Sequence, residues 1–338
     1  MTSTVPAAGN DLRAALDRLL DGLPPRRAAA AVERLMASYR GRTPTAAPVV
    51  RNRDDAVAYA AYRMPATHAA AADALGRLAA LRPGWSPATH TDAGGGTGAC
   101  VWAAAAAWPG DGARRTRVLD WSSPALDVGR ELAAGAADPA VRAAGWQRQR
   151  LTGPLPGADL VTAAYVLGEL PPDGRDALAD AAAAATAPGG AVVVVEPGTP
   201  EGYRRVLAAR ARLLAAGLRV LAPCPHQAAC PLAPDADWCH FSARVARSSL
   251  HRRVKGGSLP YEDEKFSYVT AVRDSAGPSE DAPAESRVIR HPQLRKGQVL
   301  LELCAPEGVV RRETVTRRDS ERYRAARRTA WGDAWPAG

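Results

Sequence analysis

A glycine-rich turn near residue 95 constrains the fold of this chain more than any other feature. Residues 92–98 read DAGGGTG and place Gly94, Gly96 and Gly98 directly after a short predicted strand, residues 89–92. Glycines at this spacing let the backbone turn sharply from a strand into a helix, whose free N–H groups can receive an anion. We therefore expect a cofactor to bind at this turn.

The acids around the loop favour S-adenosylmethionine as that cofactor. Asp92 lies two residues before the first glycine, where its carboxylate can contact the cationic methionyl end, and Asp120 can bind both ribose hydroxyls. Gly94, Gly96 and Ala99 also fit the dinucleotide pattern, so NAD remains an alternative, as does a glycine turn without a ligand. The residues predicted to bind the cofactor are Asp92, Gly94, Gly95, Gly96, Thr97, Gly98 and Asp120.

Short strands alternate with Ala-rich helices on both sides of the loop. This alternation is typical of an α/β fold whose parallel sheet is covered by helices on both faces. Two later strands, residues 266–273 and 298–304, are expected to be the antiparallel pair that completes a seven-stranded, Rossmann-like class I methyltransferase sheet. The five earlier strands are predicted at residues 89–92, 116–120, 146–151, 159–165 and 191–196.

The segment after the fourth predicted strand offers no recognisable catalytic group. Residues 163–170 read AAYVLGEL, without the Asn/Asp-Pro-Pro-aromatic tetrad of exocyclic-amine methyltransferases. Cys100 falls on the first helix and reads as a buried structural thiol rather than a nucleophile. Tyr165 and Glu169 could face the cofactor, or could be a packing tyrosine and a surface glutamate. We therefore leave the catalytic residues unknown.

Four of the five cysteines lie beyond residue 200. Cys224, Cys230 and Cys239 are close together in sequence without forming a tight Cys-x-x-Cys pair, and Cys304 follows at the end of a predicted strand. Four thiolates can close a tetrahedral zinc site or hold a [4Fe–4S] cluster. The spacing leaves both open, together with unliganded thiols; His226, His240 and His251 are alternative ligands.

The positive charge is concentrated in the same part of the chain. The formal net charge is +9; residues 1–200 hold 20 basic and 19 acidic residues, and residues 201–338 hold 24 and 16. Arginines interleaved with Tyr323, Trp331 and Trp335 suit phosphate contact and base stacking, although a solvated helix is an alternative. The predicted RNA-binding residues are Arg311, Arg312, Arg317, Arg318, Arg324, Arg327 and Arg328, and a second basic run beside the cysteines holds Arg244, Arg247, Arg252, Arg253 and Lys255.

Several longer segments resemble a known family, the Rsm-twenty-two-type methyltransferase-like proteins of the small ribosomal subunit. The segments are AYAAYRMPAT (58–67), VVEPGTPEGYRRV (194–206), CPHQAACP, WCHFSARVAR (238–247), YEDEKFSYV (261–269) and RRTAWGDAW (327–335), besides the glycine loop. The resemblance implies a class I methyltransferase fold that binds S-adenosylmethionine. It further implies a [4Fe–4S] cluster on Cys224, Cys230, Cys239 and Cys304, and association with the rRNA and proteins of the small ribosomal subunit. A polar first strand, residues 88–91, departs from the apolar strand expected there.

The domain organisation and location follow from these patterns. Asp11 and Asp17 lie in the N-terminal amphipathic stretch, which therefore reads neither as a secretory signal nor as an acid-poor transit peptide. We expect a cytoplasmic monomer without a membrane segment, either an assembly factor or an active rRNA methyltransferase, with an NAD-linked redox enzyme as the further alternative. The expected regions are a helical region (1–85), a cofactor-binding core (86–220), a cysteine-rich insertion (221–264), final sheet strands (265–316) and an Arg/Trp-rich tail (317–338).

Overall fold

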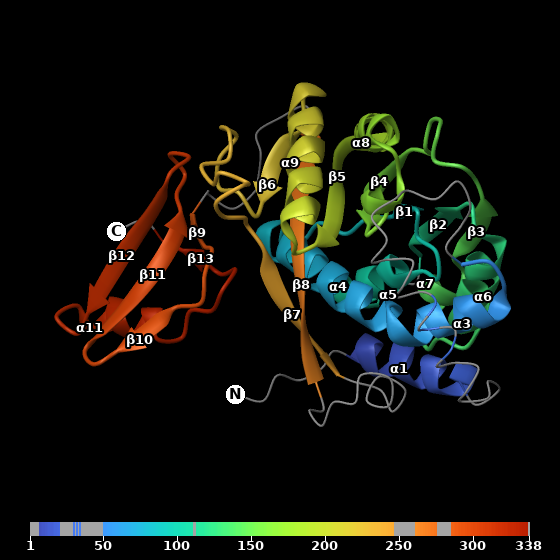
Figure 1. Cartoon of the computed structure of the whole chain (residues 1–338), viewed down its shortest axis with the longest axis horizontal. Coiled ribbons are helices and arrows are strands. Elements are labelled where there is room, and N and C mark those ends of the chain that lie inside the picture. The colour runs from blue at the N-terminus through green and yellow to red at the C-terminus, as the bar shows by residue number, and fades with distance from the viewer. Residues whose placement is uncertain are drawn as a thin grey trace.

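The computed structural model describes residues 7–20, 30, 32, 34, 50–110, 113–246, 261–275 and 285–336. They form an α/β body and, beside it, a smaller C-terminal sheet that carries the end of the chain (Figure 1). Among the described helices, none is both long and apolar enough to cross a membrane.

An eight-stranded sheet forms the centre of the α/β body. Its order is β3-β2-β1-β4-β5-β8-β6, with β7 paired to β8 beyond the end of β5. Strands β1 to β5 are parallel, whereas β8 runs antiparallel to β5 and β6. The strands are β1 (Thr89–Ala93), β2 (Arg115–Asp120), β3 (Gly145–Arg148), β4 (Ala158–Ala164), β5 (Thr186–Pro197), β6 (Arg219–Ala222), β7 (Phe241–Ala246) and β8 (Tyr261–Val272).

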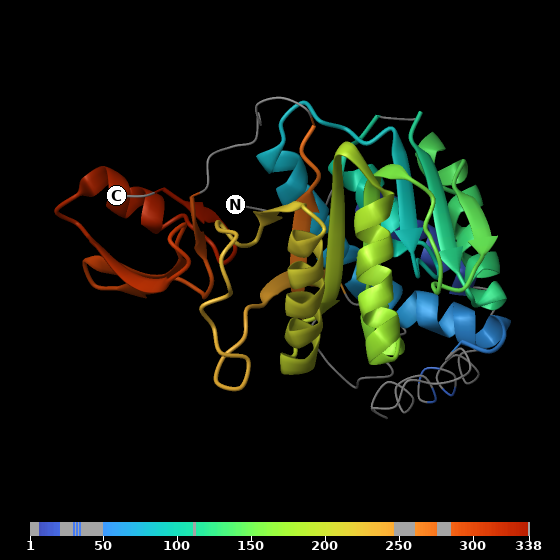
Figure 2. The ribbon, with the colours of Figure 1, turned by 90° about the horizontal axis from the view of Figure 1, so that it is seen from above.

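Helices cover both faces of this sheet, as the sequence predicts (Figure 2). Strand β5 contains four consecutive buried valines, residues 192–195, because a parallel strand covered on both faces is apolar along its whole length. Helices α4 (Met64–Leu81), α5 (Ala99–Ala107) and α6 (Ser123–Ala134) cover one face; α8 (Pro172–Ala185) and α9 (Pro200–Ala215) cover the other. Outside the first layer lie α1 (Ala7–Leu20) and α3 (Arg53–Tyr62), and the short elements α7 (Pro139–Arg142) and η1 (Leu167–Glu169) complete the body.

The chain reverses its direction of winding between β1 and β4. From β1 it proceeds through β2 to β3 at one edge, and from β4 through β5 toward the other. Loops that leave two neighbouring strands in opposite directions open a crevice at their carboxyl ends, which is where ligands bind in such sheets. The glycine loop after β1 and the segment after β4 meet at this crevice.

The C-terminal sheet corrects one prediction. Residues 266–273 do join the main sheet through β8, but residues 298–304 form β11 of a separate five-stranded sheet, and their predicted pairing was wrong. The edge next to β8 is taken instead by the short strand β6. The second sheet comprises β9 (Ser286–Val288), β10 (Gln293–Arg295), β11 (Gln298–Cys304), β12 (Val310–Thr316) and β13 (Ala334–Trp335), with α11 (Ser320–Ala326) packed on it.

Candidate functional site

The glycine loop has the strained backbone that the sequence predicts. Gly94, Gly96 and Gly98 have φ of 70°, 51° and 85°, a region that side chains with a Cβ rarely adopt. A Cβ at Gly98 would come within 2.5 Å of the Trp146 ring, so glycine is also needed for close packing. Thr97 is buried within the turn, and α5 begins immediately after it.

The structure brings Asp120 to this loop. Its Oδ2 accepts a hydrogen bond from Gly96 N at 3.0 Å, and its Oδ1 accepts one from Ser122 N at 2.8 Å. Burial raises the pKa of Asp120, while these backbone donors counteract that effect. Each carboxylate oxygen can accept a further hydrogen bond, so the side chain can still bind hydroxyl groups.

Asp92 is fully buried beneath the loop with one oxygen unpaired. Its Oδ1 accepts a hydrogen bond from Thr162 Oγ1 at 2.7 Å, whereas its Oδ2 has no hydrogen-bond partner among the described residues. A Cβ at Gly95 would lie 2.3 Å from that Oδ2, which shows how closely the loop covers it. Burial raises the pKa of Asp92 to about 7. A buried carboxylate with a free oxygen is suited to a cationic partner.

The polar side chains of the first strand are buried or half-buried and hydrogen-bonded. His90 Nε2 lies 2.8 Å from Thr162 Oγ1. Because the Thr162 hydroxyl donates to Asp92, His90 Nε2 must be the donor in its own bond. Burial lowers the pKa of His90 to about 3, so the ring is neutral. His90 therefore supports Asp92 through Thr162, whereas Thr89 bonds to Asp159 and Thr91 donates to Pro156 O.

A second group of polar residues lies where β4 ends. Tyr165 is the one described non-glycine residue with positive φ, at 59°, and its Oη donates to Glu264 Oε1 at 2.9 Å. Arg63 lies 3.3 Å from the same oxygen and 5.6 Å from the Tyr165 ring centroid. Sequence reasoning missed Arg63 and Glu264, although both fall inside the family-like segments 58–67 and 261–269.

The segment after β4 is held by a buried carboxylate from β5. Glu196 is completely buried and accepts hydrogen bonds from Leu167 N at 3.0 Å and from Arg205 Nε at 2.6 Å. Burial raises the pKa of Glu196, and Arg205 opposes this. Both residues lie in the family-like segment 194–206, which thus fixes the backbone beside Tyr165.

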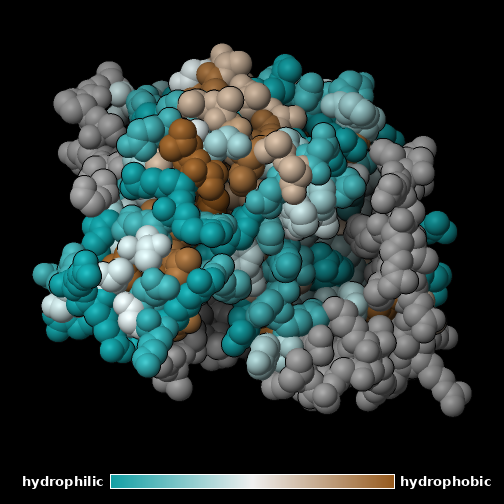
Figure 3. Space-filling model, turned by 60° about the vertical axis from the view of Figure 1, so that its left-hand side comes forward, coloured by the Kyte–Doolittle hydropathy of each residue, from teal (hydrophilic) through white to brown (hydrophobic). Residues whose placement is uncertain are grey.

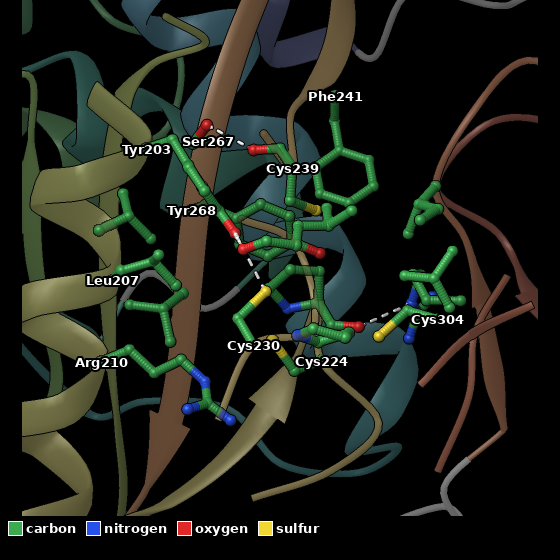
Figure 4. Close-up of a pocket in the computed structure, with 18 residues that line it drawn as sticks. Tyr203, Leu207, Arg210, Cys224, Cys230, Cys239, Phe241, Ser267, Tyr268 and Cys304 are labelled. Carbon is green, nitrogen blue, oxygen red and sulfur yellow. Dashed lines mark hydrogen bonds between the residues drawn. The ribbon is translucent and has the colours of Figure 1, made fainter. Parts of the chain in front are cut away.

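The four cysteines that the sequence suggests as metal ligands line one cavity (Figure 4). It lies between α9, β8 and the C-terminal sheet, and the space between atoms there, open solvent included, is about 550 Å³. Burial, and then the proximity of the other thiols, raise the pKa of Cys239, and the pKa of Cys304 to about 12. Cys100 is buried away from the cavity in the helical face of the body, consistent with a structural thiol.

The four thiols surround the cavity without converging on one point. Among the described residues, no three His, Cys, Asp or Glu side chains are close enough to hold a single metal ion. Of the alternative ligands, His226 Nε2 lies 3.4 Å from Cys304 Sγ, whereas His240 stacks on Trp238 at 5.3 Å. His251 lies outside the described residues. Tyr203 Oη is 3.0 Å from Cys230 Sγ, a contact that the sequence did not indicate.

The arginine-rich end of the chain is folded rather than a tail. Trp335 is buried in the core of the C-terminal sheet and Trp331 packs against His240 and His291, so neither is free to stack on a base. The predicted RNA-binding arginines themselves are exposed, and Figure 3 shows a largely hydrophilic surface on this side of the molecule. These are Arg311 and Arg312 on β12, Arg317 and Arg318 after it, Arg324 on α11, and Arg327 and Arg328 beyond.

Two ion pairs reduce the free charge of the basic regions. Arg312 pairs with Glu302 at 2.6 Å, and Arg244 pairs with Asp263 at 3.1 Å. The other members of the second basic run, Arg247, Arg252, Arg253 and Lys255, lie outside the described residues.

Comparison with known proteins identifies relatives among mitochondrial ribosome proteins. The human protein named ribosome assembly protein METTL17, mitochondrial, is 29% identical over 82% of this chain and 62% of its own length. The Saccharomyces cerevisiae ribosome assembly protein RSM22, mitochondrial, is 24% identical over 44% of this chain and 39% of its own length. The chain thus spans less than two thirds of either relative.

Solved structures similar to this chain include methyltransferases. A TehB-like SAM-dependent methyltransferase from Corynebacterium glutamicum matches with a TM-score of 0.36 and 16% identity, covering 60% of this chain and 88% of that protein. A putative RNA methyltransferase from Pyrococcus horikoshii matches with a TM-score of 0.38 and 14% identity, covering 60% and 84%. The family model described as mitochondrial small ribosomal subunit Rsm22 matches residues 53–336, and the chain therefore belongs to the Rsm22 family.

Proposed function

We propose that this protein is an S-adenosylmethionine-binding, methyltransferase-like assembly factor of the small ribosomal subunit, with a [4Fe–4S] cluster on its four clustered cysteines. The observation that supports it most is the position of the cysteine cavity. Three thiols come from the α/β body and Cys304 comes from the C-terminal sheet. A group bound there would join the cofactor-binding body to the C-terminal sheet that carries the exposed arginines.

The residues at the β1–β4 crevice fit S-adenosylmethionine. The unpaired Oδ2 of Asp92 would receive the methionyl ammonium, the loop N–H groups would face its carboxylate, and Asp120 would bind the ribose. Calorimetric titration with S-adenosylmethionine and with NAD tests this choice. Stronger binding of NAD would favour the redox alternative and contradict the proposal.

The donor set in the cavity, four thiols, fits a [4Fe–4S] cluster, and the spacing of the sulfurs is what would distinguish a cluster from zinc. Zn–S bonds of ~2.3 Å in a tetrahedron would bring the sulfurs to about 3.8 Å of one another. In a cluster each thiolate binds a different iron, so the sulfurs lie further apart around a larger volume. All four thiols line a single cavity, as a four-cysteine cluster requires. The cluster would supply a cross-link between the two sheets, since structural metal binding contributes directly to folding.

Metal analysis of anaerobically purified protein tests the cluster. We expect about four iron and four sulfide per chain, with the visible absorbance of an iron–sulfur cluster lost in Cys224→Ser. A colourless protein with one zinc per chain would overturn the assignment while leaving the ribosomal role intact. That role is tested separately by binding of the loaded protein to small-subunit rRNA.

Active rRNA methylation is the second candidate, favoured by the strained Tyr165 at the crevice. Non-glycine residues at positive φ concentrate at functional sites. Mass spectrometry of small-subunit rRNA from cells with and without the gene would decide between them. Loss of one methyl group in the deletion strain would show catalysis, whereas unchanged methylation with impaired subunit assembly would support a non-catalytic factor.

A further inference from the structure

Two buried arginines face the cysteine cavity. Arg210 on α9 is 5% exposed and Arg287 on β9 is 6% exposed, and both line the cavity. In Figure 4 the Arg210 guanidinium lies in the same part of the cavity wall as Cys224 and Cys230. The two arginines come from different parts of the fold, one from the α/β body and one from the C-terminal sheet, as the cysteines do.

Their hydrogen bonds go to the backbone and not to acids. Arg210 Nη2 donates to His226 O at 3.0 Å and to Ala228 O at 2.8 Å. Arg287 donates from Nε to Pro223 O at 3.2 Å and from Nη1 to Gly332 O at 3.0 Å. Within the described part of the chain neither guanidinium pairs with a carboxylate, and Arg210 Nε has no hydrogen-bond partner.

Such charges are costly without an anion nearby. Arginine stays protonated in proteins, so burial leaves two full positive charges beside the cavity. The groups within reach that can become anionic are the cysteine thiols, because Arg210 and Arg287 line the same cavity as all four cysteines. Both positive charges therefore lie beside the cysteine ligands.

The charges also match those of a loaded site. Four thiolates around a Zn²⁺ ion, or around an oxidised [4Fe–4S] core of the same +2 charge, leave a net charge of −2. Two guanidiniums supply +2. A filled cavity would be neutral, whereas an empty cavity with protonated thiols would leave both cations uncompensated.

We propose that Arg210 and Arg287 are the counter-charges of the group bound by the four cysteines and hold it in place electrostatically. This inference rests on the proposed metal centre. It assigns both arginines as positioning residues that act through the cysteines. Their hydrogen bonds to the carbonyls of residues 223, 226 and 228 also brace the ligand loops, so charge and bracing must be separated by experiment.

Substitutions that keep or remove the charge make this separation. The positive charge is removed in Arg210→Gln and Arg287→Gln. It is retained in Arg210→Lys and Arg287→Lys. Arg212→Gln is the matched control, because Arg212 lies on the same helix but is exposed and pairs with Asp176 and Asp180. Arg→Met variants, which keep most of the side-chain volume, replace any Gln variant that does not fold.

Two measurements on anaerobically purified full-length protein test the proposal. The first is the rate at which bound metal is lost to a chelator, which should rise about tenfold in each Gln variant, since residues that support metal ligands typically contribute 10–100-fold to affinity. The second is the midpoint potential in a dithionite titration followed by electron paramagnetic resonance. Removing a nearby positive charge should make the reduced cluster harder to form, so the potential should fall in the Gln variants and remain close to wild type in the Lys variants.

The outcomes distinguish this inference from the function on which it rests. Wild-type protein without bound metal would overturn the metal centre and the counter-charges together. Loaded wild-type protein with Gln variants that keep both their metal and their potential would overturn the counter-charges alone. If the midpoint potential of the Lys variants falls as far as that of the Gln variants, the arginines act through their hydrogen bonds to the ligand loops and not through their charge. If the wild-type protein binds zinc, the rate of zinc loss is the only measurement that tests the counter-charges. That rate should be higher in the Gln variants than in the Lys variants and the wild type.

Discussion

The phenol oxygen of Tyr165 donates a hydrogen bond of 2.9 Å to Glu264 while the Tyr165 backbone is held at a φ of 59°. This bond joins the end of β4 to the part of β8 that extends beyond β5. Such a backbone conformation costs about 1–3 kcal/mol and persists only when its surroundings enforce it. Arg63 binds the same carboxylate, so the crevice is closed on this side by a polar contact between three separate segments.

Tyr165→Phe should therefore destabilise the protein. It removes the hydrogen bond to a charged acceptor and should lower the free energy of unfolding by about 1.5–3 kcal/mol, measured by urea denaturation. Tyr261→Phe on the same strand as Glu264 is the control, because Tyr261 is exposed and should tolerate the change. Equal stability of the two variants would show that the Tyr165 hydrogen bond contributes nothing.

Thr162→Val should weaken both the fold and cofactor binding. The change removes the donor to Asp92 and leaves His90 Nε2 without its acceptor, at an expected cost of about 1–3 kcal/mol. Binding of S-adenosylmethionine should weaken about tenfold, as calorimetry would show, because the Asp92 carboxylate loses its orientation. Thr270→Val is a close control on the same sheet, since the buried Thr270 hydroxyl has no hydrogen-bond partner in the described part of the chain. An unchanged affinity for S-adenosylmethionine in Thr162→Val would show that the polar network of β1 does not contribute to cofactor binding.

Asp92 should make the apoprotein less stable as pH rises. Its pKa is raised from 3.8 to about 7, so between these values the folded protein binds a proton that the unfolded chain has lost. Stability contributed by the neutral acid is complete below about pH 4 and is lost as pH approaches and passes 7. Urea denaturation from pH 4 to 8 should show this decline, and Asp92→Asn should flatten it relative to the exposed control Asp127→Asn. A decline of the same size in Asp92→Asn would assign the pH dependence to another group.

Binding of S-adenosylmethionine should show the opposite pH dependence. Its ammonium group requires the ionised carboxylate, so affinity should rise as the pH passes through about 7. Calorimetry at pH 6 and pH 8 measures the difference. Equal affinity at the two values would mean that Asp92 does not contact the cation.

The exposed arginines after β12 should give RNA binding its salt dependence. Replacing Arg317 and Arg318 together with Gln should weaken binding to small-subunit rRNA and reduce the slope of log K against log salt by about 1.4–1.8. Arg312→Gln should have a smaller effect because Glu302 already neutralises that side chain. A slope that remains at the wild-type value in the double variant would exclude Arg317 and Arg318 from the RNA contact.

Local patterns in the sequence were sufficient for much of the α/β body. The glycine spacing, Asp92 and Asp120 could be located because the loop, its two acids and the strands before them lie close in sequence and have strong preferences. The cysteines could be grouped because thiols are rare in this chain. In each case the chemistry resides in a few residues and does not depend on distant packing.

Short elements and distant contacts could not be predicted in the same way. Strands β6, β9, β10 and β13 are too short to show alternation, and they exist because longer neighbours pair with them. The arginine-rich end looked like a tail because the burial of Trp335 depends on its pairing with Ser286 on β9, far earlier in the sequence. The Arg63–Glu264 contact joins positions 201 residues apart, which no local pattern can indicate.

The placement of Cys304 also determines when the site can be completed. Cys224, Cys230 and Cys239 are synthesised within 16 residues of one another, but Cys304 follows only with β11, 65 residues later. During translation the nascent chain therefore lacks the fourth ligand of the proposed site until β9, β10 and β11 of the C-terminal sheet have been made. Loading of a four-cysteine site must follow synthesis of Cys304, and a chain terminated before that position would be left with three ligands.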